Sequence, residues 1–467
     1  MFMLCEPAMG AAAISSLSTF SRDPLLTRPL MLDTGSVLPG DSAPLLCPKG
    51  GALTGGPLTL AQAVNVALCS NPQVQGSWAA IKAQAAGLGE ARAAYLPTVT
   101  LGAGRLGDRT WYPNHSGSNT DVRAGTLYGT ISWRLFDFGE RRANVRAATA
   151  LLSAALANHD AVLQKTLADV IQAYFDAQTS RAAWSARQTD EMLARQILQA
   201  AQRREKRGVD AQTDTLQAAT ALAKASLDKS RARGAYRKAL SVLVYEMGVP
   251  ANTPLTLADD LTDSNAALRQ NLAAWLQEAQ TKHPAIVAAR AQLAAARAKV
   301  IATQAEGLPT IDLTGNFYQN GRPNQNLPVV NTREALVGVT LTIPLFEGFA
   351  RTYKVRGAQA QVEREEANLQ DTQEHVLMEV VKTYADAQSA LDNLQASQHL
   401  LSAARAALTS VQRKYDKGAT DILELLSAQR ALSDAQQERI RDQAEWRSAR
   451  LRLLADTGML GSKGLEP

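Results

Sequence analysis

Four segments of the chain alternate apolar residues with small polar ones at a period of two. They span residues 98–109, 126–136, 310–320 and 333–343. In the first segment Val99 and Leu101 are separated by threonine, and the others follow the same pattern. A period of two predicts strands, each with one apolar face and one polar face.

The segments that follow each strand pair have the pattern of long helices. No proline occurs between Pro113 and Pro250, or between Pro344 and Pro467. In the first window, apolar residues recur at spacings of three and four, as from Leu163 to Leu167, which predicts a packing seam. The predicted helix that ends at Gly208 is about 100 Å long. Each strand pair is also preceded by a predicted helix, over residues 59–94 and 266–306.

The chain contains the same sequence unit twice. Gly208 and Gly248 recur 210 residues later as Gly418 and Gly458, and the sequence Leu-Pro-Thr at 96–98 recurs at 308–310. Such self-similarity is typical of an internal repeat. We therefore expect four parts: a leader over 1–57, a first repeat over 58–250, a second repeat over 251–460, and a tail over 461–467.

Strands of this length predict a membrane protein built from a sheet. Strands of about 9–11 residues cross a bilayer when tilted. Four strands are too few to close a barrel, and an open sheet edge in lipid leaves costly unpaired backbone groups. The expected fold is therefore an α+β membrane protein in which a homotrimer forms a twelve-stranded β-barrel, continued by an α-helical coiled-coil tunnel. A soluble periplasmic coiled-coil scaffold is the alternative of another class.

Charge and composition narrow the choice of partners. The chain has 467 residues, a net charge of +5 and 20% charged residues of both signs, interspersed along the helices. This pattern is typical of solvated helix faces, so we expect no nucleic-acid partner. No stretch approaches 18 consecutive apolar residues, which excludes an apolar membrane-spanning helix.

The sequence carries no catalytic or metal-binding constellation. Its five histidines form no metal-ligand motif, and no nucleophile-elbow or phosphate-loop motif occurs. We therefore expect no enzyme activity, no cofactor and no metal. Cys47 and Cys69 are 22 residues apart and form a disulfide in an oxidising compartment, or else remain two free thiols.

The turns at Gly208 and Gly418 are the tips of two predicted helical hairpins. Glycine there supplies the positive φ that ends a helix. Glu424 and Asp214 follow the two tips and are also 210 residues apart. They are either ordinary acids in the first turn of a helix or, with threefold symmetry, an acidic ring that favours cations.

With the repeat in place, the segments LTLAQAVNVALCSNP and KYDKGATDILELLSAQRAL resemble the TolC family of trimeric outer-membrane export ducts. The resemblance covers roughly residues 57–460. It implies a barrel in the cell outer membrane, surrounded by its lipid, and a helical tunnel in the periplasm. It also implies a periplasmic adaptor protein and an inner-membrane ABC or proton-driven transporter as partners.

The resemblance also assigns roles at the tips. It implies a gate in which Tyr415 bonds Asp214, and a pore constriction at Glu424. Thr420 stands where the family has a gate arginine, so part of that latch is missing. The resemblance implies that the tip turns contact the adaptor. These turns lie at Gly208, Val209, Gly418 and Ala419.

The expected function is that of a passive exit duct. Within the family the chain is similar to the CyaE-type branch, which implies type I secretion of a haemolysin-like protein toxin. Tripartite efflux of drugs and other small molecules is the alternative cargo, because both cargoes pass through the same pore. Neighbouring genes for a transporter and its cargo would separate the two.

Overall fold

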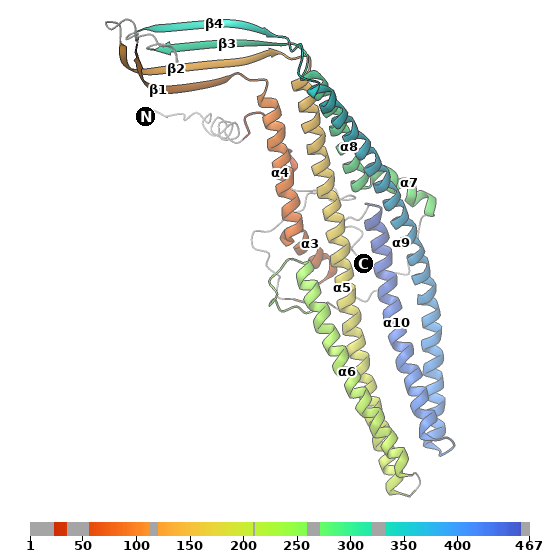
Figure 1. Cartoon of the computed structure of the whole chain (residues 1–467). Helices are drawn as coiled ribbons and strands as arrows, with labels where there is room; N and C mark the ends of the chain where they lie inside the picture. Colours follow the sequence, from red (N-terminus) through yellow and green to blue (C-terminus); the bar gives the residue numbers. More distant parts are fainter. Residues whose placement is uncertain are drawn as a thin grey trace, which may run out of the picture. The chain divides into compact units, whose positions relative to one another are not determined.

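The computed structural model describes residues 23–34, 56–111, 120–208, 211–258, 271–319 and 332–458. In chain order its elements are α2 (Met31–Thr34), α3 (Leu60–Ser70), α4 (Pro72–Ala93), β1 (Thr98–Thr110), β2 (Thr120–Phe136), α5 (Glu140–Lys206), α6 (Gln212–Glu246), α7 (Leu272–Lys282), α8 (Pro284–Ala305), β3 (Thr310–Gln319), β4 (Arg333–Thr342), α9 (Ala350–Asp416) and α10 (Ile422–Asp456) (Figure 1).

The internal repeat is confirmed in the lengths of the helices. Helices α3 and α7 have 11 residues each, and α4 and α8 have 22 each. Helices α5 and α9 have 67 residues each, and α6 and α10 have 35 each. The two repeats therefore present the same series of helices, in the same order around a pair of strands.

The prediction of a single helix before each strand pair is wrong at one point in each repeat. The helix is interrupted between α3 and α4 at Asn71, and between α7 and α8 at His283. Each interruption precedes a proline, which lacks the backbone donor of a helix interior and restrains the residue before it to extended angles. Accordingly, Asn71 has φ −64° and ψ 126°, and His283 has φ −60° and ψ 126°.

The four strands form one antiparallel sheet in the order β1-β2-β3-β4 (Figure 1). The observed strands lie within one residue of the predicted ends except at β2, which begins at Thr120 rather than 126. It is longer because its pairing with β1 continues as far as Thr110 opposite Thr120. Among the described residues, strands β1 and β4 lie at the two edges, each paired on one side only.

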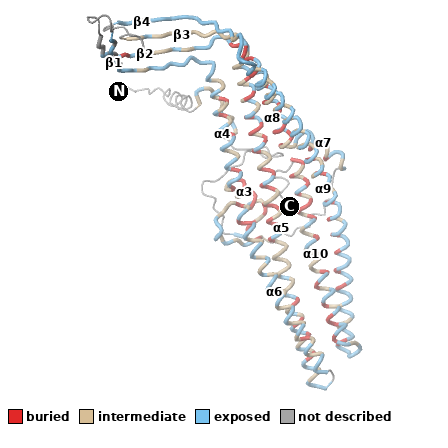
Figure 2. Tube along the Cα trace, viewed as in Figure 1, coloured by how far each residue is buried: buried red, intermediate tan, exposed pale blue. Residues whose placement is uncertain are grey.

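The chain divides into two compact units, and each repeat contributes to both. The first unit comprises Met1–Leu30, Ala80–Leu156 and Ala288–Gln370, and it contains the sheet. Its strand residues are mostly exposed or intermediate in burial (Figure 2). The second unit comprises Met31–Ala79, Ala157–Val287 and Asp371–Pro467.

The second unit has a hydrophobic core around Tyr174, which is 1% exposed. The Tyr174 hydroxyl donates a hydrogen bond to the carbonyl oxygen of Leu58, at 3.1 Å. Leu58 also forms a parallel bridge with Leu257, in the segment that follows α6. The core therefore ties the start of the first repeat to the link between the repeats.

The same unit buries a histidine completely. His159 lies on α5, its Nδ1 is 2.6 Å from the Ser77 hydroxyl, and its ring lies 4.6 Å from that of Trp78. Burial lowers the pKa of His159 to about 4 and raises the pKa of the neighbouring Asp160 to about 6. None of the helices within the described ranges is both long enough and apolar enough to cross a membrane.

Candidate functional site: hairpin tips and membrane face

Each helical hairpin turns at a glycine with a left-handed backbone. Gly208 has φ +71° and Gly418 has φ +75°, a conformation that L side chains rarely adopt. At the second tip, Gly418 donates to the carbonyl of Tyr415 at 2.9 Å, and Ala419 donates to that of Lys414 at 2.9 Å. These bonds satisfy carbonyls at the end of α9 that have no partner within the helix.

Gly208, Gly418 and Ala419 are all exposed, as a docking surface at the tips requires. Val209, the other predicted tip residue, lies outside the described residues. The contact between these turns and an adaptor remains a prediction.

The predicted gate tyrosine lies where the two hairpins meet. Tyr415 is 2% exposed and belongs to a buried cluster that draws on α5, α6, α9 and α10. The other buried members are Ile197, Ala201, Ala218, Ile422, Leu425 and Leu426. An aromatic side chain buried among both hairpins contributes a large contact area that holds their ends together.

An arginine that the sequence analysis did not single out adds polar contacts at this point. The guanidinium of Arg204, on the last turn of α5, lies 4.8 Å from the centroid of the Tyr415 ring. Its Nη1 donates a hydrogen bond to the Tyr415 carbonyl oxygen at 2.9 Å. Arg204 therefore links the ends of α5 and α9 by a cation–π contact and a charge-assisted hydrogen bond.

The two predicted carboxylates occupy matching positions in the first turns of α6 and α10. Asp214 is half-buried in the first turn of α6. Glu424 is exposed, and its carboxylate accepts a hydrogen bond from the Thr420 hydroxyl. The residue in the place of the family's arginine thus bonds within its own helix start, and the Asp214–Tyr415 bond remains a prediction.

Farther from the tips, a buried polar cluster joins α5 to α10. The Asp190 carboxylate accepts hydrogen bonds from the Ser433 hydroxyl at 2.6 Å and from Arg187 at 3.2 Å. Arg187 also donates to the Ser433 hydroxyl at 2.6 Å. The cluster borders a cavity of about 530 Å³ that is lined by residues of α5, α6 and α10.

The sheet has one apolar and one polar face. On the apolar face Leu101 is 77% exposed and Val337 is 82% exposed. On the polar face the Thr130 hydroxyl bonds Asn316 at 3.0 Å. An exposed apolar face with a polar reverse is the pattern of a strand pair between lipid and a water-filled lumen.

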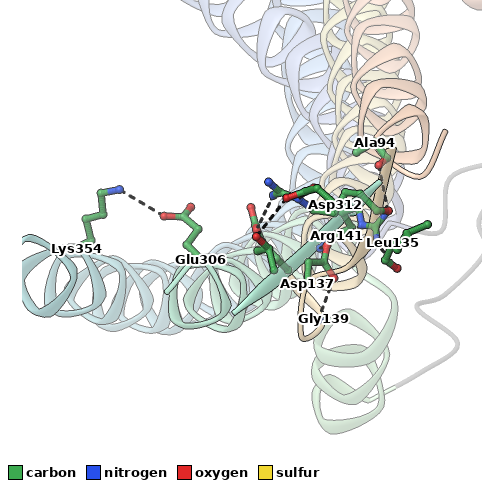
Figure 3. A network of polar contacts seen from close by, with 11 residues as sticks. Ala94, Leu135, Asp137, Gly139, Arg141, Glu306, Asp312 and Lys354 are labelled. Carbon is green, nitrogen blue, oxygen red and sulfur yellow. Dashed lines mark hydrogen bonds and ion pairs between the residues drawn. The ribbon is translucent and has the colours of Figure 1, made fainter. Parts of the chain in front are cut away.

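A polar network fixes the junction between β2 and α5 (Figure 3). Arg141 bonds the Asp137 carboxylate at 2.6 Å, donates to the carbonyl of Arg134 at 2.6 Å and lies 4.7 Å from the centroid of the Tyr95 ring. Burial raises the pKa of Asp137, but hydrogen bonds from the side chain and backbone of Arg141 outweigh it, so the pKa is lowered overall. In the second repeat, Arg351 takes the place of Arg141.

The remaining predicted chemistry involves cysteines and metals. Cys69 is disulfide-bonded. Cys47, its predicted partner, lies outside the described residues, so the pairing remains a prediction. Within the described ranges, no group of three or more histidine, cysteine, aspartate or glutamate side chains is placed to hold a metal ion.

Comparisons with known proteins agree with this geometry. The family model described as "Outer membrane efflux protein" matches residues 63–249 and 275–459, one match for each repeat. Protein CyaE of Bordetella pertussis is 38% identical over 410 residues, covering 88% of this chain and 86% of that protein. The alkaline protease secretion protein AprF of Pseudomonas aeruginosa is 26% identical over 421 residues, covering 88% and 86%.

A solved structure of the outer-membrane channel OprN has the same fold. It aligns with a TM-score of 0.76 at 20% identity, covering 86% of this chain and 90% of that chain. The match to the family model and to CyaE covers most of the two repeats. The chain belongs to the outer membrane efflux protein family, whose members are non-enzymatic transport channels of the outer membrane.

Proposed function

We propose that this chain is the outer-membrane exit channel of a type I secretion system that exports a protein. The observation that carries the proposal is a sheet with one apolar face and two open edges, β1 and β4, joined to long helices. An open edge is not stable in lipid, so copies of the chain must pair β1 with β4. Three copies supply twelve strands, enough to enclose a lumen.

The cargo follows from the relatives rather than from the channel wall. CyaE is 38% identical over most of the chain, and AprF is named for the secretion of a protease. TolC-family channels are homotrimers that work with periplasmic adaptors and inner-membrane transporters. An ABC transporter and an adaptor are therefore the partners that we assign here, with a haemolysin-like toxin as the exported protein.

Small-molecule efflux is the second candidate, because the matching family model is described as an efflux protein. A deletion strain separates the two functions. Loss of the chain should abolish release of the transporter's protein substrate into the medium, and a plasmid copy should restore it. Unchanged secretion with increased sensitivity to dyes and detergents would assign the chain to an efflux pump instead.

The channel is closed, in this proposal, by contacts that hold the two hairpin tips of each chain together. Tyr415 is buried between the hairpins, and Arg204 caps the end of α9 through the Tyr415 carbonyl. Because Thr420 has no guanidinium, Arg204 takes over the cationic part of the latch within one chain. Release of these contacts lets the hairpins separate and widens the tip.

The constriction of the closed channel is formed by the carboxylates of Asp214 and Glu424. They lie in the first turns of α6 and α10, one turn from the tips. Threefold symmetry would bring six such carboxylates to one level. A ring of this kind attracts cations to the pore entrance and excludes small anions.

A further inference from the structure

The apolar face of the sheet ends in arginines at the end remote from the helices. On β1 the apolar series Val99, Leu101 and Ala103 is followed by Arg105 on the same face. On β4 the series that ends at Val337 and Ala335 is followed by Arg333. On β2 an exposed arginine, Arg123, follows the apolar residues of the same face. Three of the four strands therefore have an exposed arginine at the end of their apolar series.

The strand register brings these arginines to nearly the same level. Arg333 pairs with Gln319, which pairs with Leu127, which pairs with Ala103. Arg105 is two residues farther from the helices on β1 than Ala103. It therefore lies two residues along the strand beyond the level of Arg333. Arg123 pairs with Gly107 and lies one step beyond Arg105. The three positions follow one another around the rim of the apolar face.

The depth of the apolar band places this rim at the membrane surface. Ile343, 52% exposed, directly follows β4 at its helix end and continues the apolar series of that strand. Ten residues separate it from Arg333, which is about 33 Å along the strand. A tilt of about 40° reduces this to about 25 Å, the height of the apolar band of an outer-membrane barrel. Arg333 therefore lies at the level of the outer-leaflet head groups.

Two glycines leave space beside the arginines on β1 and β2. Arg105 faces Gly125 across the strand pair, and Arg123 faces Gly107. A Cβ built on either glycine would meet no atom within 4 Å. The arginines are diagonal neighbours, about 7–8 Å apart at the backbone. Two cations at that spacing repel one another, and an anion in the open space between them removes the repulsion.

The arginine side chains of this site favour phosphate as the bound anion. Guanidinium groups bind phosphate oxygens through paired hydrogen bonds and are weakly hydrated. An arginine on the lipid face is strongly destabilising at the bilayer midplane but costs little at the interface, where it meets head groups. Arg109, the next arginine on β1, pairs in register with Asp121 and is not part of this site.

We propose that Arg105, Arg123 and Arg333 form a cationic rim that binds the phosphate groups of lipid A in the outer leaflet. The apolar band directly below the rim receives the acyl chains of the same molecule. The rim thereby fixes the depth and tilt of the barrel in the membrane. The proposal depends on the outer-membrane location of the chain, and it is independent of the cargo and of the gate.

Native mass spectrometry of the full-length protein in detergent tests the rim directly. Titration with bisphosphorylated lipid A and with the same lipid lacking both phosphates gives two affinities. We expect the phosphorylated lipid to bind at least tenfold more tightly to the wild-type protein. Equal affinities would overturn the proposal without recourse to any variant.

Variants then assign the effect to the three arginines. Replacing Arg105, Arg123 and Arg333 together by glutamine should remove the preference for phosphorylated lipid A, whereas replacement by lysine should retain part of it. The matched control replaces three exposed helix arginines by glutamine: Arg142, Arg233 and Arg405. A control that loses as much preference as the rim variant would contradict the assignment. Should the triple variant fail to assemble, Arg333→Gln alone should still weaken the preference severalfold.

Discussion

Replacing Arg204 by glutamine tests the latch that we assign to the hairpin tips. Glutamine keeps the helix propensity of α5 and much of the length of the side chain, but it has no charge. The substitution therefore removes the cation–π contact with Tyr415 and the charge on the hydrogen bond to its carbonyl oxygen. The buried Tyr415 ring and the glycine turns are left in place.

The size of the effect follows from these two contacts. A cation–π contact at a partly exposed site contributes about 0.5–1 kcal/mol. A hydrogen bond from a charged donor contributes about 1.5–3 kcal/mol. Arg204 is half-buried, so we take the lower end and expect a total of about 2 kcal/mol per chain. This corresponds to roughly a 30-fold shift in each chain toward separated tips.

Single-channel conductance in planar bilayers reads out this shift. Arg204→Gln should raise the fraction of time spent in the high-conductance state by at least tenfold. The matched control is Arg203→Gln, which removes the same charge from an exposed neighbour on the same turn. Tyr415→Phe keeps the ring and should have a smaller effect, unless it is combined with Asp214→Asn. Identical conductance for the Arg204 and Arg203 variants would refute the latch.

Three further predictions concern other parts of the chain. Arg141→Gln should lower the free energy of unfolding by about 3 kcal/mol in chemical denaturation, because it breaks a buried ion pair. Arg351→Gln breaks a more exposed ion pair, 3.8 Å long, and should lower the free energy of unfolding by less than about 1 kcal/mol. Asp160→Asn should raise the melting temperature at pH 7.5 and not at pH 4.5, and an equal change at both pH values would contradict this prediction. His159→Gln should reduce the loss of stability between pH 6.5 and 4. Glu424→Ala should weaken block of the channel by multivalent cations, and an unchanged blocking concentration would exclude Glu424 from the constriction.

The signs of the pH effects follow from the direction of each shift. The folded state holds the pKa of Asp160 at about 6, above its ordinary value, so ionisation opposes folding above that pH and the cost disappears in acid. For His159 the pKa is lowered to about 4, so the unfolded state binds the proton first as the pH falls below 6.5. The two residues therefore act in opposite directions between pH 6.5 and 4, and single variants are needed to separate them.

The sequence predicts the elements of this fold well where the local pattern is strong. Strand β1 alternates threonine and glycine with apolar residues, and the glycines at 208 and 418 mark the hairpin turns in both repeats. The sequence pattern predicts the second strand from residue 126 onward, whereas β2 begins at Thr120. Val122 and Ala124 lie on the opposite face from Leu127, so the apolar pattern changes phase there, and pairing with β1 continues the strand across the change.

The contacts that define the candidate gate are not visible in a local pattern. Arg204 lies in a run of cations at the end of α5, which the helix dipole alone explains. Its partner Tyr415 is 211 residues away, on the second repeat. Arg141 is hidden in the same way, because its contacts with Tyr95 and with the end of β2 arise only when α4 and α5 lie beside the sheet.

The number of chains in the channel is the most direct test of the account. The sheet has two open edges, and closure in a membrane requires copies of the same chain. Native mass spectrometry of protein extracted with detergent from outer membranes should give a single assembly of three chains. A stable monomer, or release of the chain from cells without detergent, would contradict the account.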